Sequence, residues 1–436
     1  MIEARVDRTR LTLFGPEGAR AYPLPQREHS AWLDLFRHIA ADFGTRLPRA
    51  REPWATAARE PAIRPLLTEP VAPGIRDGYG DPAVLRTPEG WHLVVTSNDA
   101  PDAFPLLFSP DLEHWEHRGF VFPEGRTPAW ALTGEGEADF WAPELHRVGE
   151  AYWLVFTARN HARELCIGLA RAPSPDGPFV ADSEPLLTGG TIDAHLCVRG
   201  PDEVLLFWKE DRNAVWPRLL ATRLHADPGL ADRLFDDGAD RRTTHLCASL
   251  WRWAATATPM EQFFALQPLI ESVVARYDSV RARLGDHPDV VAAMCTPVLA
   301  RRLAPDGRAL LGEPRTVLVN DLAWEGHLIE GNWVTAQAGR YWLFYAGNDF
   351  STPDYGIGVA VADDPLGPYA KQTEPLLRTT ADWWGPGHPS VAPGPDGAPH
   401  LFFHAFKPGT GGYKVFRALL TAKLRFEGER VRLAER

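Results

Sequence analysis

Five strand-like segments recur along the chain, and this repeat constrains the fold more than any other feature. Each segment is rich in aromatic and β-branched residues, follows a turn signal and is preceded by a shorter extended piece. The segments are WHLVVTSND from residue 91, YWLVFTARN from 152, EVLLFWKED from 203, YWLFYAGND from 341 and HLFFHAFK from 400. Each unit is therefore predicted to begin with a hairpin of two buried strands and to contain about four strands in all.

The spacing of the segments predicts an all-β fold with one large insertion. Successive segments begin roughly 61, 51, 138 and 59 residues apart, so that only one interval is unlike the others. Four-stranded units that repeat in this way close around an axis in a β-propeller. We therefore expect a five-bladed β-propeller over residues 71–436, interrupted by an α-helical insertion at residues 229–296 and preceded by an N-terminal extension over residues 1–70.

The insertion and the extension each contain a helix signal. In the insertion, Thr258, Pro259 and Glu261 form a capping box with proline at the first helical position, and an apolar stripe follows as far as Leu284. Three roles remain open for this stripe: packing on the side of the propeller, a lid over a pocket, or a dimer contact. In the extension, SAWLDLFRHIAADFG predicts a short helix that we expect to brace the blades.

The connection of the insertion to the propeller is also open. Both RLLATRLHADPG, which begins at Arg218, and PVLARRLAPDGRALLGEP, which begins at Pro297, have the pattern of a third strand. An insertion between the second and third strands would leave the propeller at the end where the first strand starts. An insertion between the third and fourth strands would leave it at the opposite end.

Composition excludes some classes of function. A net charge of −11 gives no basic face for nucleic acid, and nowhere do eighteen apolar residues run together as a membrane span requires. The N-terminal residues show no secretory signal, so we expect a cytoplasmic protein that binds neither nucleic acid nor membrane. The four cysteines have no CxxC spacing and are expected to be reduced.

Acidic residues recur at the start of the first strand in three of the five units. Asp81 stands ten residues before Trp91, Asp193 ten before Glu203, and Glu330 eleven before Tyr341. Because the first strands of a propeller line its axis, we expect these three carboxyl groups to occupy one slot of the repeat and to converge on a shared cavity. The alternative for any one of them is a carboxylate at a strand edge that accepts backbone hydrogen bonds.

Converging carboxyl groups suit the hydrolysis of glycosidic bonds. One carboxyl group must be protonated to assist the leaving oxygen, and a second must be ionised to activate water or to attack. A third acid close to the proton donor raises its pKa by repulsion between like charges. Three acids in one hollow therefore match three roles.

The motifs GDPAVL, FWAPEL, TIDAHLCV, LLFWKEDRNA, LIEGNW and GPGHPSV, in this order, resemble the five-bladed propeller enzymes of glycoside hydrolase family 43. The resemblance implies that Asp81 is the general base, Glu330 the general acid, and Asp193 the residue that tunes and orients the acid. It also implies inversion of configuration, with base and acid roughly 6.5 to 9.5 Å apart. The helical insertion and the sequence Asp193-Ala194-His195 depart from the family pattern, and Asp77 competes with Asp81 for the role of base.

Two further positions are candidates for substrate binding. Trp141 lies in the corresponding slot of the second unit and can offer an apolar plane to a sugar ring, although packing between blades would also explain it. His388, twelve residues before His400, holds this place in the fifth unit. The resemblance implies that this position lies under the pocket floor and can take part in binding a structural calcium ion, but no cofactor is required.

These observations favour an inverting, exo-acting glycoside hydrolase that releases L-arabinofuranose or D-xylose from a small glycoside or oligosaccharide. Two alternatives remain. A glycoside phosphorylase would need a cluster of arginine, lysine and histidine where water should bind, and none is evident at the starts of the units. A non-catalytic carbohydrate-binding propeller would use the acids only to bind hydroxyl groups. Formation of a homo-oligomer through the insertion is a further expectation.

Overall fold

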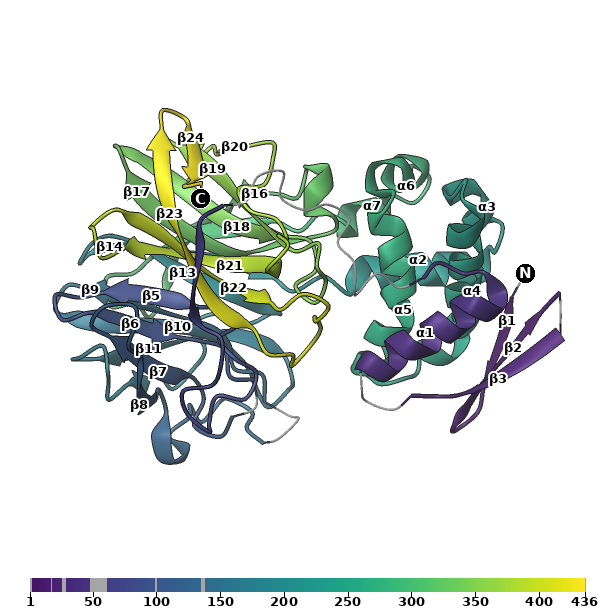
Figure 1. Cartoon of the computed structure of the whole chain (residues 1–436), viewed down its shortest axis with the longest axis horizontal. Helices are drawn as coiled ribbons and strands as arrows, with labels where there is room; N and C mark the ends of the chain where they lie inside the picture. Colours follow the sequence, from purple (N-terminus) through teal and green to yellow (C-terminus); the bar gives the residue numbers. More distant parts are fainter. Residues whose placement is uncertain are drawn as a thin grey trace. The chain divides into compact units, whose positions relative to one another are not determined.

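The chain divides into two units, which Figure 1 shows with their secondary structure. The computed structural model describes residues 2–16, 18–25, 29–47, 61–98, 100–134 and 138–435. The unit that we call the helical unit contains Met1–Glu52, Arg212–Cys295 and Gly326–Leu328. The unit that we call the sheet unit contains Pro53–Asp211, Thr296–Glu325 and Ile329–Arg436.

Five antiparallel sheets follow one another along the sheet unit. The first contains β5 (Ala83–Arg86), β6 (Trp91–Val94), β7 (Pro105–Ser109) and β8 (Glu116–Phe120). The second contains β9 (Trp141–Val148), β10 (Ala151–Arg159), β11 (Leu165–Ala172) and β12 (Val180–Ala181), and the third contains β13 (Thr191–Gly200), β14 (Glu203–Glu210), β15 (Val298–Leu303) and β16 (Leu310–Leu318). The fourth contains β17 (Ile329–Gln337), β18 (Arg340–Gly347), β19 (Gly356–Ala362) and β20 (Ala370–Lys371).

The fifth sheet closes the series with β21 (Trp384–Pro393), β22 (Pro399–Phe406), β23 (Ala418–Glu427) and β24 (Arg430–Leu433), and β4 (Ile63–Leu67) also pairs with β23. Two short 3₁₀ helices, η1 (Pro123–Gly125) and η2 (Ala323–Glu325), lie in the connections. The repeated segments of the sequence form the second strands β6, β10, β14, β18 and β22. The predicted hairpins, and an all-β unit made of several sheets, are therefore confirmed.

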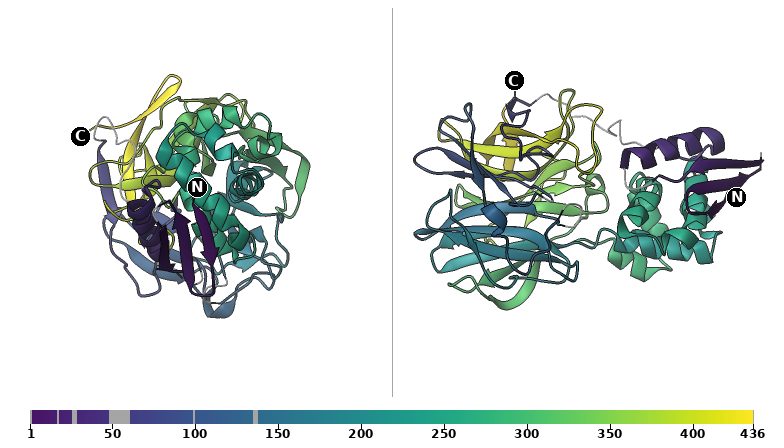
Figure 2. Two further views of the ribbon diagram at one scale, coloured as in Figure 1. Left: turned by 90° about the vertical axis from the view of Figure 1, so that its right-hand side faces the viewer. Right: turned by 90° about the horizontal axis from the view of Figure 1, so that it is seen from below.

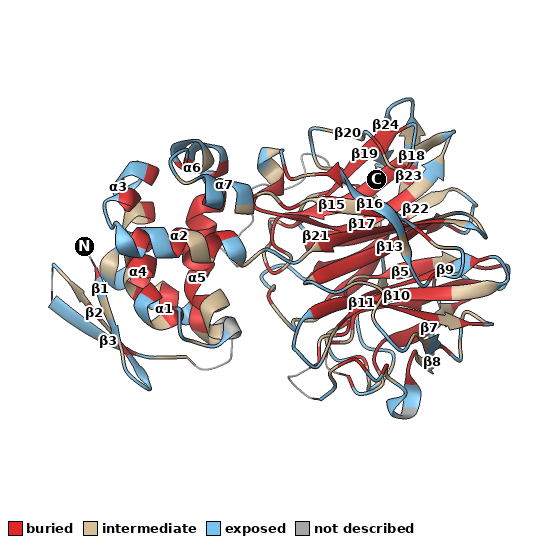
Figure 3. Ribbon diagram, turned by 180° about the vertical axis from the view of Figure 1, so that it is seen from behind, coloured by how far each residue is buried: buried red, intermediate tan, exposed pale blue. Residues whose placement is uncertain are grey.

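The first strands of the five sheets are neighbours in a cyclic order. β5 contacts β9, and the contacts continue through β13, β17 and β21 back to β5. Figure 3 shows in red that the inner strands of this unit are largely buried, whereas outer strands such as β16 are exposed over much of their length. In β10, Leu154 and Phe156 pack into one core cluster, whereas Trp153 and Val155 pack into another. Because successive side chains of a strand point to opposite faces, an unbroken apolar run fits a sheet that is covered on both sides.

The helical unit combines a small sheet with seven helices (Figure 2). Its elements are β1 (Glu3–Val6), β2 (Arg10–Gly15), β3 (Gly18–Pro23), α1 (His29–Phe43), α2 (Val215–Ala226), α3 (Leu230–Leu234), α4 (Gly238–Ala254), α5 (Pro259–Val274), α6 (Tyr277–Arg283) and α7 (Pro288–Ala293). The predicted capping box of Thr258 and Glu261 begins α5. Of the helices that the structure describes, none has both the length and the apolarity needed to cross a bilayer.

Helix α1 has a different partner from the one that we expected. It packs within the helical unit, where Trp32 stacks on Trp253 with ring centroids 6.1 Å apart. Phe264 of α5 lies on the same indole at 6.2 Å. Large aromatic side chains contribute most of the buried area in such contacts, which accounts for the choice of partner.

The structure also settles how the insertion connects to the sheet unit. The segment RLLATRLHADPG is not a strand, because α2 covers most of it and buries Trp216, Leu220 and Leu224 at a helical spacing of four residues. The third strand is β15, so the insertion joins the second and third strands of the third sheet. The helix predicted from Thr258 to Leu284 breaks after Val274 into α5 and α6, since the N–H groups of Ala275 and Arg276 close the last turn of α5.

Candidate active site

A β-bulge lies near the start of β9, β13, β17 and β21. At these bulges, and just ahead of β5, one residue lies in the left-handed region. These residues are Asp81 (φ 53°), Ala142 (φ 43°), Asp193 (φ 55°), Gly331 (φ 58°) and His388 (φ 48°). Aspartate tolerates this conformation better than most residues, and left-handed residues cluster at functional sites. The bulge turns the strand end so that consecutive side chains can reach the same region.

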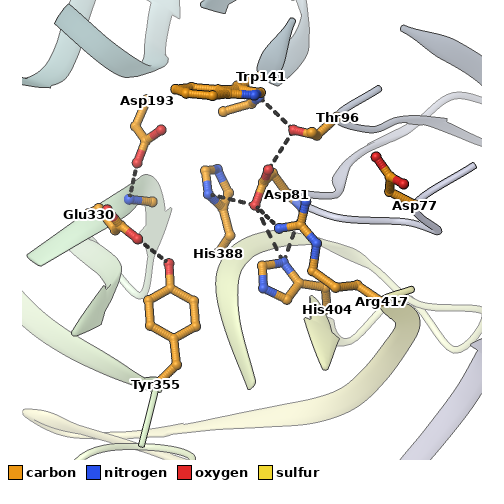
Figure 4. Close-up of polar contacts among 12 residues, drawn as sticks. Asp77, Asp81, Thr96, Trp141, Asp193, Glu330, Tyr355, His388, His404 and Arg417 are labelled. Atoms are coloured by element: carbon orange, nitrogen blue, oxygen red, sulfur yellow. Dashed lines mark hydrogen bonds and ion pairs between the residues drawn. The ribbon is translucent and has the colours of Figure 1, made fainter. Parts of the chain in front are cut away.

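The bulges correct the register that the sequence suggested. Asp81, Asp193 and His388 occupy the left-handed position, whereas Glu330 precedes the left-handed Gly331 and therefore corresponds to Trp141, which precedes Ala142. The three acids thus fill two adjacent slots instead of one. The spacing of eleven residues for Glu330, against ten for Asp81 and Asp193, reflects this shift of one residue. Figure 4 nevertheless shows Asp81, Asp193 and Glu330 in one group, with His388 between Asp81 and Asp193.

Asp81 is held as a carboxylate by donors that lie just after β6 and just before β23. Arg417 Nη1 donates to its Oδ1 at 2.9 Å, and the Thr96 hydroxyl donates to its Oδ2. Burial alone raises the pKa of Asp81, but the Arg417 guanidinium, two neighbouring histidines and the Thr96 hydroxyl outweigh it, and the pKa lies well below its usual range. The backbone N–H of Asp81 donates to Nδ1 of His404 at 3.0 Å, and burial lowers the pKa of His404. Asp81 is therefore ionised across the physiological pH range.

Asp193 lies against the strand that carries Glu330. Its Oδ2 accepts the backbone N–H of Gly331 at 2.8 Å, and Asn332 Nδ2 donates to its backbone carbonyl at 3.3 Å. Burial raises the pKa of Asp193, the charges of His388 and Lys209 oppose this effect, and the Asp81 carboxylate adds to it. The absence of a side chain at Gly331 also lets its strand approach His388, since a Cβ at this position would lie 3.0 Å from the His388 Cα.

Glu330 has the opposite electrostatic character from Asp81. Its Oε1 accepts the Tyr355 hydroxyl at 2.9 Å, and its Oε2 lies 3.3 Å from Nζ of Lys209. Burial raises the pKa of Glu330 to about 7, with the Asp193 carboxylate adding to the effect and Lys209 opposing it. A carboxyl group with this pKa carries a proton for much of the time near neutrality and can donate it.

Trp141 is oriented by a chain of hydrogen bonds that begins at Asp77. Asn98 Nδ2 donates to Oδ2 of Asp77 at 2.5 Å, and Trp141 Nε1 donates to Oδ1 of Asn98 at 2.9 Å. The half-buried indole ring lies beside Asp193 in Figure 4, whereas Asp77 lies to the side of the acids. The guanidinium of Arg159 is 5.6 Å from the ring centroid. Asp77 therefore supports Trp141 and does not join the group of Asp81, Asp193 and Glu330.

The residues described around His388 offer few of the free oxygen ligands that a calcium ion prefers. His388 Nδ1 lies 3.4 Å from Oδ1 of Asp81, whose two oxygens are already held by Arg417 and Thr96. Calcium takes six to eight oxygen ligands, and a guanidinium beside the site disfavours a second cation. We therefore derive no step through a metal, and calcium near His388 stays a prediction.

A buried cluster of Glu144, His146 and His195 has the composition of a metal site but not the free donor atoms. The backbone N–H of Val334 donates to Nε2 of His195 at 2.9 Å, so Nδ1 carries the proton and donates to Oε2 of Glu144 at 2.7 Å. His146 Nε2 meets the same oxygen at 2.8 Å. Burial raises the pKa of Glu144 to about 7 and lowers that of His195 to about 3. The cluster is a closed hydrogen-bond network.

The model of the family described as "Glycosyl hydrolases family 43" matches residues 68–233 and 294–429, which is more than half of the chain. The chain belongs to this family. The motifs in the sequence indicated the same family. The unmatched residues 234–293 lie within the helical unit.

Individual relatives of this family 43 hydrolase are distant. The probable arabinan endo-1,5-alpha-L-arabinosidase A of Aspergillus flavus is 25% identical over 155 residues, a match that spans 34% of this chain and 45% of the relative. A thermostable family-43 glycoside hydrolase has a TM-score of 0.57 at 23% identity, covering 82% of this chain and 92% of that one. Xylan beta-1,4-xylosidase from Bacillus halodurans has a TM-score of 0.55 at 14% identity, covering 83% of this chain and 56% of that one. The chain thus spans less than half of the curated relative.

Sequence reasoning missed the residues that surround the acids in this hydrolase. Lys209 and His404 lie on second strands, opposite the bulges, and Thr96 has the corresponding place in the first sheet. Arg417 and Tyr355 lie just before β23 and β19. The only available signal was a polar residue at the end of an apolar run, as in LLFWK before Glu210. The sequence did not show that the Arg417 guanidinium and the imidazole rings of His388 and His404 lie around Asp81.

Proposed function

We propose that the protein hydrolyses glycosides with inversion of configuration, with Asp81 as general base and Glu330 as general acid. One observation carries this proposal: the two carboxyl groups have opposite pKa shifts within one site, that of Asp81 well below its usual range and that of Glu330 raised to about 7. Pairs of titratable groups whose environments separate their pKa values mark acid and base assignments.

In the proposed reaction, Asp81 accepts a proton from water while the water oxygen bonds to the anomeric carbon. The bond from that carbon to the leaving oxygen breaks, its electron pair stays on the oxygen, and the proton of Glu330 joins it. The reaction consumes one water molecule and leaves Asp81 protonated and Glu330 ionised. Return of the proton through solvent restores the starting state. Asp193, fixed by the Gly331 N–H, adds negative charge that favours the protonated form of Glu330.

The substrate is proposed to be a pentoside, either an L-arabinofuranoside or a D-xyloside of small size. The names of the relatives support this class, since one is an arabinan endo-arabinosidase and another a xylan xylosidase. Trp141 offers the plane for a sugar ring, and His388 faces the same region. We further propose exo action in the reducing interior of the cell, where the four free cysteines would persist as thiols.

The architecture proposed for the sheet unit is a five-bladed β-propeller. Support comes from five sheets of at least four strands and from the cyclic order of their first strands. In this arrangement the first strands line the axis, which is where the bulges and the acids lie. Association through the helical unit remains a prediction that gel filtration would test.

The test is hydrolysis of 4-nitrophenyl α-L-arabinofuranoside and β-D-xylopyranoside, with the first-formed sugar anomer identified by ¹H NMR. We expect release of one pentose with inverted configuration, and a loss of about 100- to 10,000-fold in kcat for Asp81→Asn. Asp202→Asn is the control, because this acid is exposed in the turn between β13 and β14. Retention of configuration would overturn the assignment, phosphate-dependent cleavage would indicate a phosphorylase, and cleavage of neither glycoside would favour a non-catalytic role.

A further inference from the structure

We propose that Lys209 is a positioning residue for Glu330, and that its buried ammonium group holds the carboxylate that remains after Glu330 has given its proton to the leaving group. This inference rests on the proposed role of Glu330 as the acid. Lys209 lies on β14, outside the motifs to which a role was assigned. Its side chain is fully buried, with an exposure of 0%, and Nζ lies 3.3 Å from Oε2 of Glu330.

The repeat itself marks the position of Lys209. In the register of the third sheet, Lys209 pairs with Ile192, the residue before the left-handed Asp193. The corresponding residue of the fifth sheet is His404, which pairs with Gly387 and accepts the N–H of Asp81. In the first sheet it is Thr96, which holds the Asp81 carboxylate. At three of the five equivalent positions, the side chain thus contacts one of the proposed catalytic acids, either at its carboxyl group or at its backbone N–H.

The charges around Glu330 explain why a cation is needed there. Asp193 on β13 and Asp349 after β18 are the acids that raise the pKa of Glu330, and the Tyr355 hydroxyl is a neutral donor ahead of β19. His388 on β21 acts mainly on Asp81 and Asp193. Lys209 is therefore the cation among the groups that act on Glu330 in the described part of the chain. Its charge balances Asp193 while Glu330 is protonated.

Proton transfer changes this balance. When Glu330 becomes ionised, two carboxylates, those of Glu330 and Asp193, face one another in a buried site. Without a cation the second negative charge would be strongly disfavoured, because a buried charge is costly unless it is paired. Oε2 of Glu330 already faces Nζ of Lys209, so the ionised product of the step meets a preorganised partner. Tyr355 holds the other oxygen and fixes the carboxyl plane.

Removing this charge should make Glu330 a weaker acid. An opposite charge within 4–6 Å typically shifts a carboxyl pKa by about 1 to 3 units, so in Lys209→Met the Glu330 titration should move upward by about 1 unit or more. In the pH profile of kcat/KM, the decline at high pH should move upward by the same amount, because activity requires protonated Glu330. Lys209→Arg, which keeps the charge, should restore this decline toward its wild-type position.

The decisive experiment is a ¹³C NMR titration of glutamate-labelled protein, with the Glu330 signal assigned by its absence in Glu330→Gln. This readout does not depend on activity. Lys371→Met is the matched control, since Lys371 forms an equivalent pair with the buried Glu325 at 2.6 Å, and its loss should leave the Glu330 titration unchanged. If Lys209→Met does not fold, Lys209→Gln takes its place.

The outcomes separate this inference from the proposed function. An unchanged Glu330 titration in Lys209→Met, or a change equal to that in Lys371→Met, overturns the role of Lys209 even if the enzyme hydrolyses glycosides normally. An upward shift of the titration in a protein without hydrolytic activity supports the charge pairing but overturns the proposed catalytic role of Glu330. An upward shift together with a matching shift of the high-pH limb supports both.

Discussion

Replacing Glu144 by glutamine should remove part of the pH dependence of stability. Glu144 is buried, and its Oε2 accepts hydrogen bonds from His146 and His195. Burial raises its pKa to about 7, so the folded protein binds a proton there that the unfolded chain releases at a lower pH. The stabilisation from this proton is fully present below the unfolded pKa and is lost as the pH rises through 7.

The size of the effect follows from the pKa. The pKa of Glu144 rises from 4.5 to about 7, and one pKa unit corresponds to ~1.4 kcal/mol, so the protonated group contributes about 3 kcal/mol at low pH. Linkage places roughly 2 kcal/mol of this loss between pH 5.5 and 8.5. Glutamine is neutral at every pH and should not show the loss. His146 and His195 remain in both proteins.

The assay is urea unfolding at pH 5.5 and 8.5, followed by circular dichroism at the wavelength where strands dominate. Glu144→Gln should be more stable relative to wild type at pH 8.5 than at pH 5.5, by about 2 kcal/mol. Glu150→Gln is the control, because Glu150 lies in the β9–β10 turn with a side-chain exposure of 98%. Equal pH dependence in wild type and Glu144→Gln would refute the reasoning, since Glu144 would then be ionised at no extra cost.

Three further predictions concern the site. In wild type, kcat/KM for an aryl pentoside should fall as the pH rises above about 7, where Glu330 loses its proton, and a profile flat to pH 9 would contradict this. Arg417→Met removes the charge that holds the pKa of Asp81 down, so the low-pH limb of the same profile should move upward by about 1 to 3 pH units. Gly331→Ala should cost about 1–2 kcal/mol for its φ of 58° plus about 1–3 for contact with His388, whereas Gly339→Ala, with a φ of 75° and no atom within 4 Å, should pay only the first cost. Urea unfolding of the two glycine variants tests the difference.

The hairpins of the sheet unit could be predicted because their signal is local. Each second strand is an apolar run after a turn, and a strand covered on both faces requires such a run. The helical unit was predicted less well. Its capping box is local, but the partner of Trp32 depends on Trp253, which lies more than 200 residues away. No periodicity in the sequence indicates which distant surface an amphipathic helix will cover.

In the candidate site, too, local signals could be predicted and contacts between distant residues could not. Asp81, Asp193 and Glu330 were found from their spacing within the repeat, but the bulges that set their register change the count by one residue. Arg417 and Lys209 escaped because a cation beside a carboxylate is recognisable only once the strands are paired. The opposite pKa shifts of Asp81 and Glu330 depend on these contacts and on burial, so they could be derived only from the structure.

The division of labour between Asp81 and Glu330 is tested most directly by the dependence of kcat/KM on the leaving group. Glu330→Gln should hydrolyse an aryl pentoside with an acidic phenol almost normally. Its kcat/KM for a phenyl or alkyl pentoside should fall by about 100-fold or more, because only a poor leaving group needs the proton. In Asp81→Asn, kcat/KM should fall equally for both substrates, since water must be activated in either case. An equal fall in kcat/KM for both substrates in Glu330→Gln would contradict these roles, and so would normal kcat/KM for either substrate in Asp81→Asn.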